Sequence, residues 1–444
     1  MMPGMRFIDN LSLCTSARPQ RRNASRFRLF ISLIALGIAA PAFAADATDD
    51  DAHLDEHLHE PLTISAELTW EELIEQTLIN YPRFVELAAR DTEARALANR
   101  ARKWFSGQPS AVARYQTDQL QENNDLREVE MGFELLLWRP GERRDARSLG
   151  AAAGTESGAA AVALRHEVIG LLRMVLWDIE RALNAVALAE DGIDVATELV
   201  RIVNRRYEAG DLPLSDTLLV RSTSLEREAV LVEAEAFLLD AERAYKSLSG
   251  LEMRPAEFSE SLSGPEEIDP SHPWLLLADA EVDRARAELE LIDRTARGTP
   301  TLTLAPRRER APFSSFDDSF CITFALPFGG QAHRNVETAA AARDVAQAES
   351  DRAQLLRQMD LDLHEARHDL VVIDASLVLA RERYELASRS LEMGQTAFVQ
   401  GEITLFELLR WEETARIAQR EAESLEIERQ RAIAQINQAI GEWP

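Results

Sequence analysis

Apolar residues at heptad spacing over an unusual length limit what this chain can fold into. From Val168 to Tyr207 they alternate by four and three residues, the pattern of a coiled-coil seam, and only isolated glycines interrupt the helical pattern between Gly141 and Glu208. A helix of about 65 residues extends roughly 100 Å. No compact domain has that length, so the sequence predicts a structure built on long helices.

The long helix is predicted to end in a hairpin tip at residues 205–216. Gly210 and Pro213 are helix breakers. Beyond them a return helix runs to about Leu248, with an apolar seam that only Arg227 breaks. The sequence therefore predicts two antiparallel helices joined at this tip.

Landmarks of the sequence recur at a constant offset of 191 residues. The recurring pairs are Pro82 and Pro273, Pro109 and Pro300, Phe133 and Phe324, Gly210 and Gly401, and Gly250 and Gly441. The long heptad pattern also recurs, at residues 356–391, ahead of a second tip at Gly401. These matches indicate an internal duplication. We expect structural repeats at residues 69–250 and 273–444, joined by a linker at 251–272 that contains prolines and a glycine.

Each repeat is predicted to hold a pair of strands before its long helix, because the sequence period changes there from helical to two. The predicted strands cover residues 111–116, 128–137, 301–305 and 319–326. One apolar and one polar face suit the roughly ten-residue strands of a transmembrane barrel. Trp138, at a strand end, is expected in an interfacial aromatic belt. A helix at 69–105, restarted at Pro82, precedes the first pair.

The N-terminal region predicts export. Arginines precede an apolar run at residues 29–40 and a cleavage signal that ends at Ala44, so residues 1–44 are interpreted as a signal peptide. No later window has the eighteen or more apolar residues of a transmembrane helix, which leaves strands as the means of membrane insertion. Cys321 is the only cysteine beyond residue 44, so we expect no disulfide and no lipid anchor.

Residues 45–68 are interpreted as an acidic, histidine-containing N-terminal tail. His53, His57 and His59 are weak candidates for holding a divalent metal, and a solvated polar tail is the alternative. No cofactor is predicted.

The charge and the motifs argue against two classes of function. The formal net charge is −27 at pH 7, whereas nucleic-acid binding needs a basic face. The sequence shows no nucleophile–base pair, phosphate-binding loop or zinc-protease motif, so an enzyme is not predicted.

With these features assembled, the chain resembles the TolC-type outer membrane efflux protein family over nearly all of its length beyond the signal peptide. The resemblance rests on the duplicated order of helix, strand pair, long helix and return helix. It also rests on the two tips, Tyr207 to Gly210 and Phe398 to Gly401, and on the strand-to-helix turn at residues 326–331. Each motif is weak alone, but the ordered set is specific.

The resemblance implies a mainly α-helical chain with a transmembrane β-barrel portion. Four strands per protomer would form a twelve-stranded barrel in a homotrimer, on a twelve-helix periplasmic tunnel. The implied function is the outer-membrane channel of a tripartite efflux system, whose partners are a periplasmic adaptor protein and an inner-membrane pump of the RND type. The physics agrees, because four strands cannot close a barrel alone and an open sheet edge in lipid leaves backbone groups unsatisfied.

The resemblance also assigns roles to residues at the tips. Tyr207, Gly210, Phe398 and Gly401 would form the surface that docks the adaptor. Glycine is expected at the two reversals because a side chain costs energy at positive φ.

A gate is expected six and nine residues beyond the second tip glycine, where the family places an acidic ring facing the pore. This chain has Glu407 and Arg410 there, and Asp216 is the counterpart of Glu407 in the first hairpin. At i, i+3 the two side chains share a helix face, so we expect them to pair and Glu407 to favour cations at the entrance. The alternative is an ordinary solvated pair outside the pore.

Two further alternatives stay open. His364 and His368, the histidine tail and the lack of a lipid cysteine are similar to the heavy-metal branch of the family. The two histidines share a helix face, but two ligands hold a metal poorly, and an incidental surface pair is the simpler interpretation. The long heptads could instead belong to a periplasmic coiled-coil adaptor or structural protein without a barrel, although an adaptor would show one hairpin and lipoyl-like segments.

Overall fold

The computed structural model describes residues 61–120, 125–311 and 314–444. The predicted signal peptide and the histidines His53, His57 and His59 lie outside the described residues. Every described residue belongs to one compact unit, residues 58–444.

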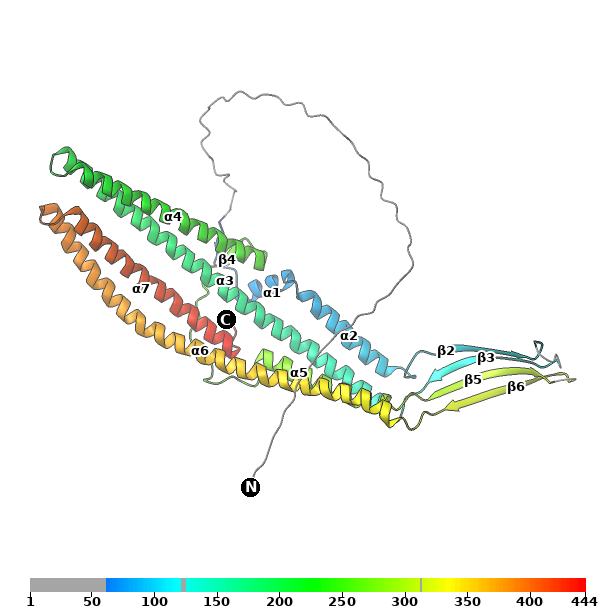
Figure 1. Ribbon diagram of the computed structural model, residues 1–444. Helices are drawn as coiled ribbons and strands as arrows, with labels where there is room; N and C mark the ends of the chain where they lie inside the picture. The colour runs from blue at the N-terminus through cyan, green and yellow to red at the C-terminus, as the bar shows by residue number, and fades with distance from the viewer. Residues whose placement is uncertain (1–60, 121–124, 312–313) are drawn as a thin grey trace, which may run out of the picture. The chain divides into compact units, whose positions relative to one another are not determined.

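The unit is mainly helical and contains two very long helices (Figure 1). The helices are α1 (Trp70–Asn80), α2 (Phe84–Arg102), α3 (Glu142–Glu208), α4 (Leu214–Ser249), α5 (Pro273–Thr295), α6 (Gln331–Gln400) and α7 (Leu405–Ile440). α3 has 67 residues and α6 has 70, which confirms the long helices that the heptads predict. The break that the sequence predicts at Pro82 separates α1 from α2.

Six strands form two sheets. They are β1 (Thr63–Ser65), β2 (Ser110–Thr117), β3 (Arg127–Leu136), β4 (Met253–Pro255), β5 (Thr301–Arg310) and β6 (Phe316–Ala325). The larger sheet is antiparallel in the order β2-β3-β5-β6, so the two predicted strand pairs meet where β3 pairs with β5.

The predicted end of the third strand, at residue 305, is wrong. β5 continues to Arg310, which lies opposite Phe316 of β6. The continuation has the sequence Pro-Arg-Arg-Glu-Arg and places charged side chains on both faces, so the apolar alternation that marks a strand in the sequence is lost there.

The sequence did not predict β1 or β4. They pair in parallel, with Thr63 opposite Met253, and they lie in the segments interpreted as tail and linker. Three residues are too few for an alternation to be visible. The pair fixes the chain before α1 against the segment that follows α4.

Between the hairpin tips and the sheet, the helices form two successive layers, and the sheet forms a third. Nearer the tips, α3 contacts α4 and α7, and α7 contacts α6, so the order is α4-α3-α7-α6 (Figure 1). Nearer the sheet, α3 contacts α2 and α5, and α5 contacts α6, which gives the order α2-α3-α5-α6. With the sheet, each of the three layers has four elements per chain, and α6 or β6 always lies at one edge.

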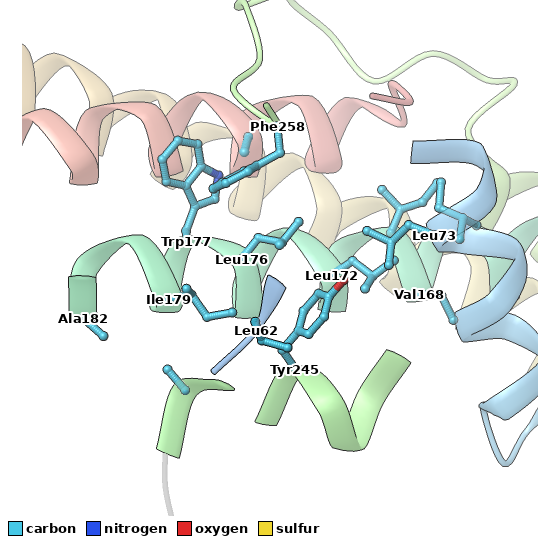
Figure 2. Close-up of a cluster of buried hydrophobic side chains, with 14 residues drawn as sticks. Leu62, Leu73, Val168, Leu172, Leu176, Trp177, Ile179, Ala182, Tyr245 and Phe258 are labelled. Atoms are coloured by element: carbon cyan, nitrogen blue, oxygen red, sulfur yellow. The ribbon is translucent and has the colours of Figure 1, made fainter. Parts of the chain in front are cut away.

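The largest core cluster lies around the middle of α3 (Figure 2). Val168, Leu172 and Ile179, at predicted heptad positions, are fully buried there. Tyr245 of α4 lies against them and donates a hydrogen bond from its hydroxyl to the carbonyl of Met253, at 2.8 Å. Burial raises the pKa of Tyr245 to about 12. The seam thus holds α4 and the short β1–β4 pair on α3.

Candidate functional site

The four-stranded sheet has two chemically different faces. Opposite residues of an antiparallel ladder point to the same side, and the register aligns Phe133 with Leu304, and Leu304 with Ile322. The exposed apolar side chains on this face include Met131, Phe133, Phe320, Ile322 and Phe324. The opposite face carries charged and small side chains, such as Glu128, Glu130, Thr303, Arg307 and Thr323. One face therefore suits lipid and the other suits water.

Both edge strands, β2 and β6, are paired on one side only within the described residues. An unpaired strand edge presents a row of backbone donors and acceptors to another chain. The sheet can therefore extend at both ends by pairing with further copies.

Trp138 lies between the end of β3 and the start of α3. Its indole N–H donates to the carbonyl of Lys103 at 3.1 Å, and its ring packs against the cluster formed by Ala101, Leu149 and Leu291. Trp138 thus contacts the helices below the sheet rather than lying with the exposed apolar side chains.

The two tips reverse at glycines in the left-handed region. φ is +83° at Gly210 and +77° at Gly401. A β-carbon at Gly210 would meet nothing within 4 Å, so the requirement for glycine at this position is set by the backbone and not by crowding.

The aromatic residues of the two tips differ in environment. Phe398 is 2% exposed and belongs to a cluster with Val203, Val220 and Leu408, which joins the tips of both hairpins. Tyr207 is 42% exposed. Tyr207 can therefore present its ring to a partner, whereas Phe398 shapes the tip from inside.

Arg206 links the two tips, although no sequence motif marks it as a functional residue. Its guanidinium Nη1 donates to the carbonyl of Phe398 at 2.8 Å, and its carbon Cζ lies 5.0 Å from the centre of the Phe398 ring. The only sequence signal was an arginine beside the aromatic residue of the first tip.

The expected pair of Glu407 and Arg410 is not found. Glu407 instead forms a capping box at the start of α7: its carboxylate accepts from the backbone N–H of Thr404 at 2.8 Å and from the Thr404 hydroxyl at 2.9 Å. These hydrogen bonds lower the pKa of Glu407. No ion pair joins Glu407 to Arg410 in the described part of the chain, and both side chains are exposed. The pairing prediction is wrong because Thr404 offers the carboxylate two nearby donors.

Asp216 stands at the corresponding position of α4 but has a different setting. The residue before α4 is Pro213, which supplies no side-chain cap. Asp216 accepts a 3.3 Å hydrogen bond from the hydroxyl of Ser215. Its carboxylate is therefore not held in a capping box.

A buried arginine joins the two hairpins further from the tips. Arg227 of α4, the residue that interrupts the predicted seam, is 5% exposed and pairs with Glu413 of α7 at 2.9 Å. Burial raises the pKa of the neighbouring Glu412. Burial also acts to raise the pKa of Glu413, but hydrogen bonds from Arg416 and Arg227 lower it. Arg227, which interrupts the apolar seam of α4, thus stabilises the contact between α4 and α7.

The histidines that matter to the fold are not those selected from the sequence. His364 and His368 are exposed on α6, and the described residues contain no cluster of three or more metal-ligating side chains around them or elsewhere. His166 and His272 are buried, with ring centres 4.9 Å apart. Burial, followed by the charges of His272 and Arg173, lowers the pKa of His166 to about 3. The ring of His166 is therefore neutral.

Within the described residues, no helix combines the length and the apolar composition needed to cross a membrane.

Comparison with solved structures identifies the fold. The outer membrane protein VceC of Vibrio cholerae is 17% identical, with a TM-score of 0.66 over 84% of this chain and 96% of that chain. The CmeC outer membrane channel of Campylobacter jejuni is 15% identical, with a TM-score of 0.67 over 84% and 85%. The MtrE outer membrane channel of Neisseria gonorrhoeae, in its open state, is 15% identical, with a TM-score of 0.64 over 84% and 88%.

Sequence comparisons add no closer relative: no protein-family model matches the chain, and no curated protein matches it. The likeness to solved structures nevertheless covers most of both partners in each case. The chain therefore has the fold of outer-membrane channel proteins, as the resemblance in its sequence predicts.

Proposed function

We propose that this chain is the outer-membrane channel subunit of a tripartite efflux system. The observation that carries the proposal is the four-stranded sheet, which has an exposed apolar face, a charged face and two open edges. A sheet of this kind is stable in lipid only if its edges are closed. The likeness to outer-membrane channels supports the same function.

Three copies would close the edges as a homotrimer. Each layer of the chain has four elements, so three chains supply a twelve-stranded barrel and a tunnel twelve helices in circumference. The repeats at 69–250 and 273–444 would each contribute half of every layer, and the predicted signal peptide would direct export to the outer membrane.

The tips would contact a periplasmic adaptor that is coupled to an inner-membrane pump of the RND type. Tyr207 and Gly210 would provide exposed contact surface, and Phe398 and Gly401 would set the shape of the second tip. Glu407, Arg410 and Asp216 would line the pore close to this entrance. Heavy-metal cations are a proposed substrate class, supported by the exposed pair His364 and His368.

Fractionation and reconstitution test the proposal. The protein should remain with the Sarkosyl-insoluble outer membrane, elute as a trimer by light scattering in detergent, and conduct ions in planar bilayers. Recovery as a stable monomer with full β content, or in the soluble periplasmic fraction, would favour the adaptor or structural alternative.

A further inference from the structure

Three arginines lie on the apolar face of the sheet, at the end farther from the helices (Figure 1). Side chains two residues apart in a strand point to the same side. In β3 the apolar face that contains Phe133 therefore continues to Arg127. In β5 the same face runs from Leu304 to Arg308 and Arg310. Arg127 lies opposite Arg310, so the face that suits lipid ends in a group of neighbouring guanidinium groups.

Most carboxylates at this end of the sheet lie on the opposite face. They are Glu128, Glu130, Glu309 and Asp317. On the arginine side, Asp125 pairs with Arg310 at 2.7 Å and with Arg127 at 3.5 Å. Asp318 pairs with Arg308 at 3.5 Å. Three arginines and two aspartates leave one net positive charge, so the sheet turns its acidic groups toward water and its basic groups toward lipid.

The guanidinium groups keep hydrogen-bond donors that the chain does not use. The Nε of Arg127 is buried and has no hydrogen-bond partner within the described residues. Arg308 and Asp318 are both exposed, and an ion pair of this kind contributes little. The Cζ atoms of Arg308 and Arg310 lie 5.2 Å and 5.5 Å from the centre of the Phe316 ring, which holds the two side chains together. Adjacent guanidinium groups with free donors suit a phosphate, which they bind through paired hydrogen bonds.

An apolar groove adjoins the arginines on the same face. It has a volume of 510 Å³ and is lined by small side chains beside large ones, among them Ala111, Ala113, Pro306, Met131, Phe133 and Phe320. Pro306 precedes Arg308 by two residues, so the groove begins about 7 Å from the arginines along the strand. A phosphate held by the arginines would thus lie directly above an apolar groove that can receive a hydrocarbon chain.

We propose that this surface binds a phosphorylated lipid of the outer leaflet of the outer membrane. The phosphate contacts Arg127, Arg308 and Arg310, and one acyl chain lies in the groove. The inference rests on the proposed channel function, which directs the helices into the periplasm and this end of the sheet outward. An arginine on the lipid face of a barrel costs little free energy at the membrane interface, where lipid headgroups lie. A free phosphate ion would use the arginines but not the groove.

Competition for a lipid probe tests the site in the wild-type protein. The probe is fluorescently labelled diphosphoryl lipid A, bound to the detergent-solubilised trimer. Unlabelled diphosphoryl lipid A should compete about tenfold better than lipid A from which both phosphates have been removed. Equal competition by the two lipids would overturn the phosphate site. Displacement of the probe by inorganic phosphate at the same concentration would assign the arginines to a free ion and overturn the lipid.

Substitutions locate the two parts of the site. R308Q should weaken binding of the probe about tenfold, whereas R114Q, an exposed arginine on the opposite face of β2, should leave it unchanged. A113F should fill the groove and weaken binding, whereas V112F, on the opposite face, should not. Trimeric variants R308Q and A113F with the wild-type affinity would overturn the proposed site.

The oligomeric state separates this inference from the function on which it rests. Light scattering is measured on every variant, and where a variant does not form a trimer the competition in the wild-type protein decides. A wild-type trimer that binds both lipids equally contradicts the lipid site alone. A wild-type monomer would instead overturn the channel assembly itself.

Discussion

Replacing Arg206 with alanine should loosen the tip of the second hairpin. The side chain donates a charge-assisted hydrogen bond to the carbonyl of Phe398 and lies over its ring. Such a hydrogen bond contributes about 1.5–3 kcal/mol, and a cation–π contact at an exposed site contributes about 0.5–1 kcal/mol. Because Arg206 is only half-buried, the lower values apply, and the loss should be about 2 kcal/mol.

Hydrogen exchange at the reversal measures this loss directly. The amide of Gly401 donates to the carbonyl of Phe398 at 3.0 Å, and the amide of Glu402 donates to the carbonyl of Ala397 at 2.9 Å. A loss of about 2 kcal/mol shifts a local opening equilibrium by about thirtyfold, so these two amides should exchange up to about thirty times faster. Amides around the core residue Leu172 should keep their wild-type rates.

Arg205→Ala is the matched control. Arg205 is adjacent and exposed, and within the described residues its side chain makes no hydrogen bond or ion pair. Equal exchange at Gly401 and Glu402 in the two variants would refute the proposed link between the tips. Faster exchange along the whole of α7 in the Arg206 variant would refute its local character.

Two further predictions concern titration and the pore. Burial lowers the pKa of His166 to about 3. Below about pH 6.5 the unfolded chain therefore binds a proton at this residue that the folded chain does not bind. The contribution of His166 to stability is complete above that pH and falls by about 1.4 kcal/mol per pH unit below it. Urea midpoints at pH 7 and pH 5 should therefore differ less in His166→Gln than in the wild type, and a variant with the wild-type difference would contradict the argument. In planar bilayers, Arg410→Asp should strengthen block by multivalent cations and Glu407→Gln should weaken cation preference, and unchanged selectivity in both would remove these residues from the pore lining.

The sequence predicted the parts of the fold that repeat over many residues. The heptads of α3 and α6 and the alternation of β2, β3 and β6 each extend over enough residues for the period to be clear. β1 and β4 were not predicted because each pairs with a segment distant in the chain. The end of β5 was not predicted because its charged residues show no apolar alternation.

At the candidate site, the sequence predicted positions better than contacts. The offset of 191 residues correctly aligned Gly210 with Gly401, because both need a backbone conformation that glycine adopts. It could not predict that Arg206 contacts Phe398, or that His166 lies beside His272, since these contacts join segments that are far apart in the sequence.

The same offset conceals a difference between the two tips. Asp216 and Glu407 are equivalent in the sequence, yet only Glu407 has a threonine at the preceding N-cap and forms a capping box. Phe398 is buried and held by Arg206, whereas its counterpart Tyr207 is exposed. The second tip is therefore fixed by its own cap and by the first hairpin, while the first tip keeps its aromatic side chain free on the surface. In the proposed channel, this difference would let the second tip set the geometry of the entrance while the first tip offers an exposed aromatic side chain to a partner.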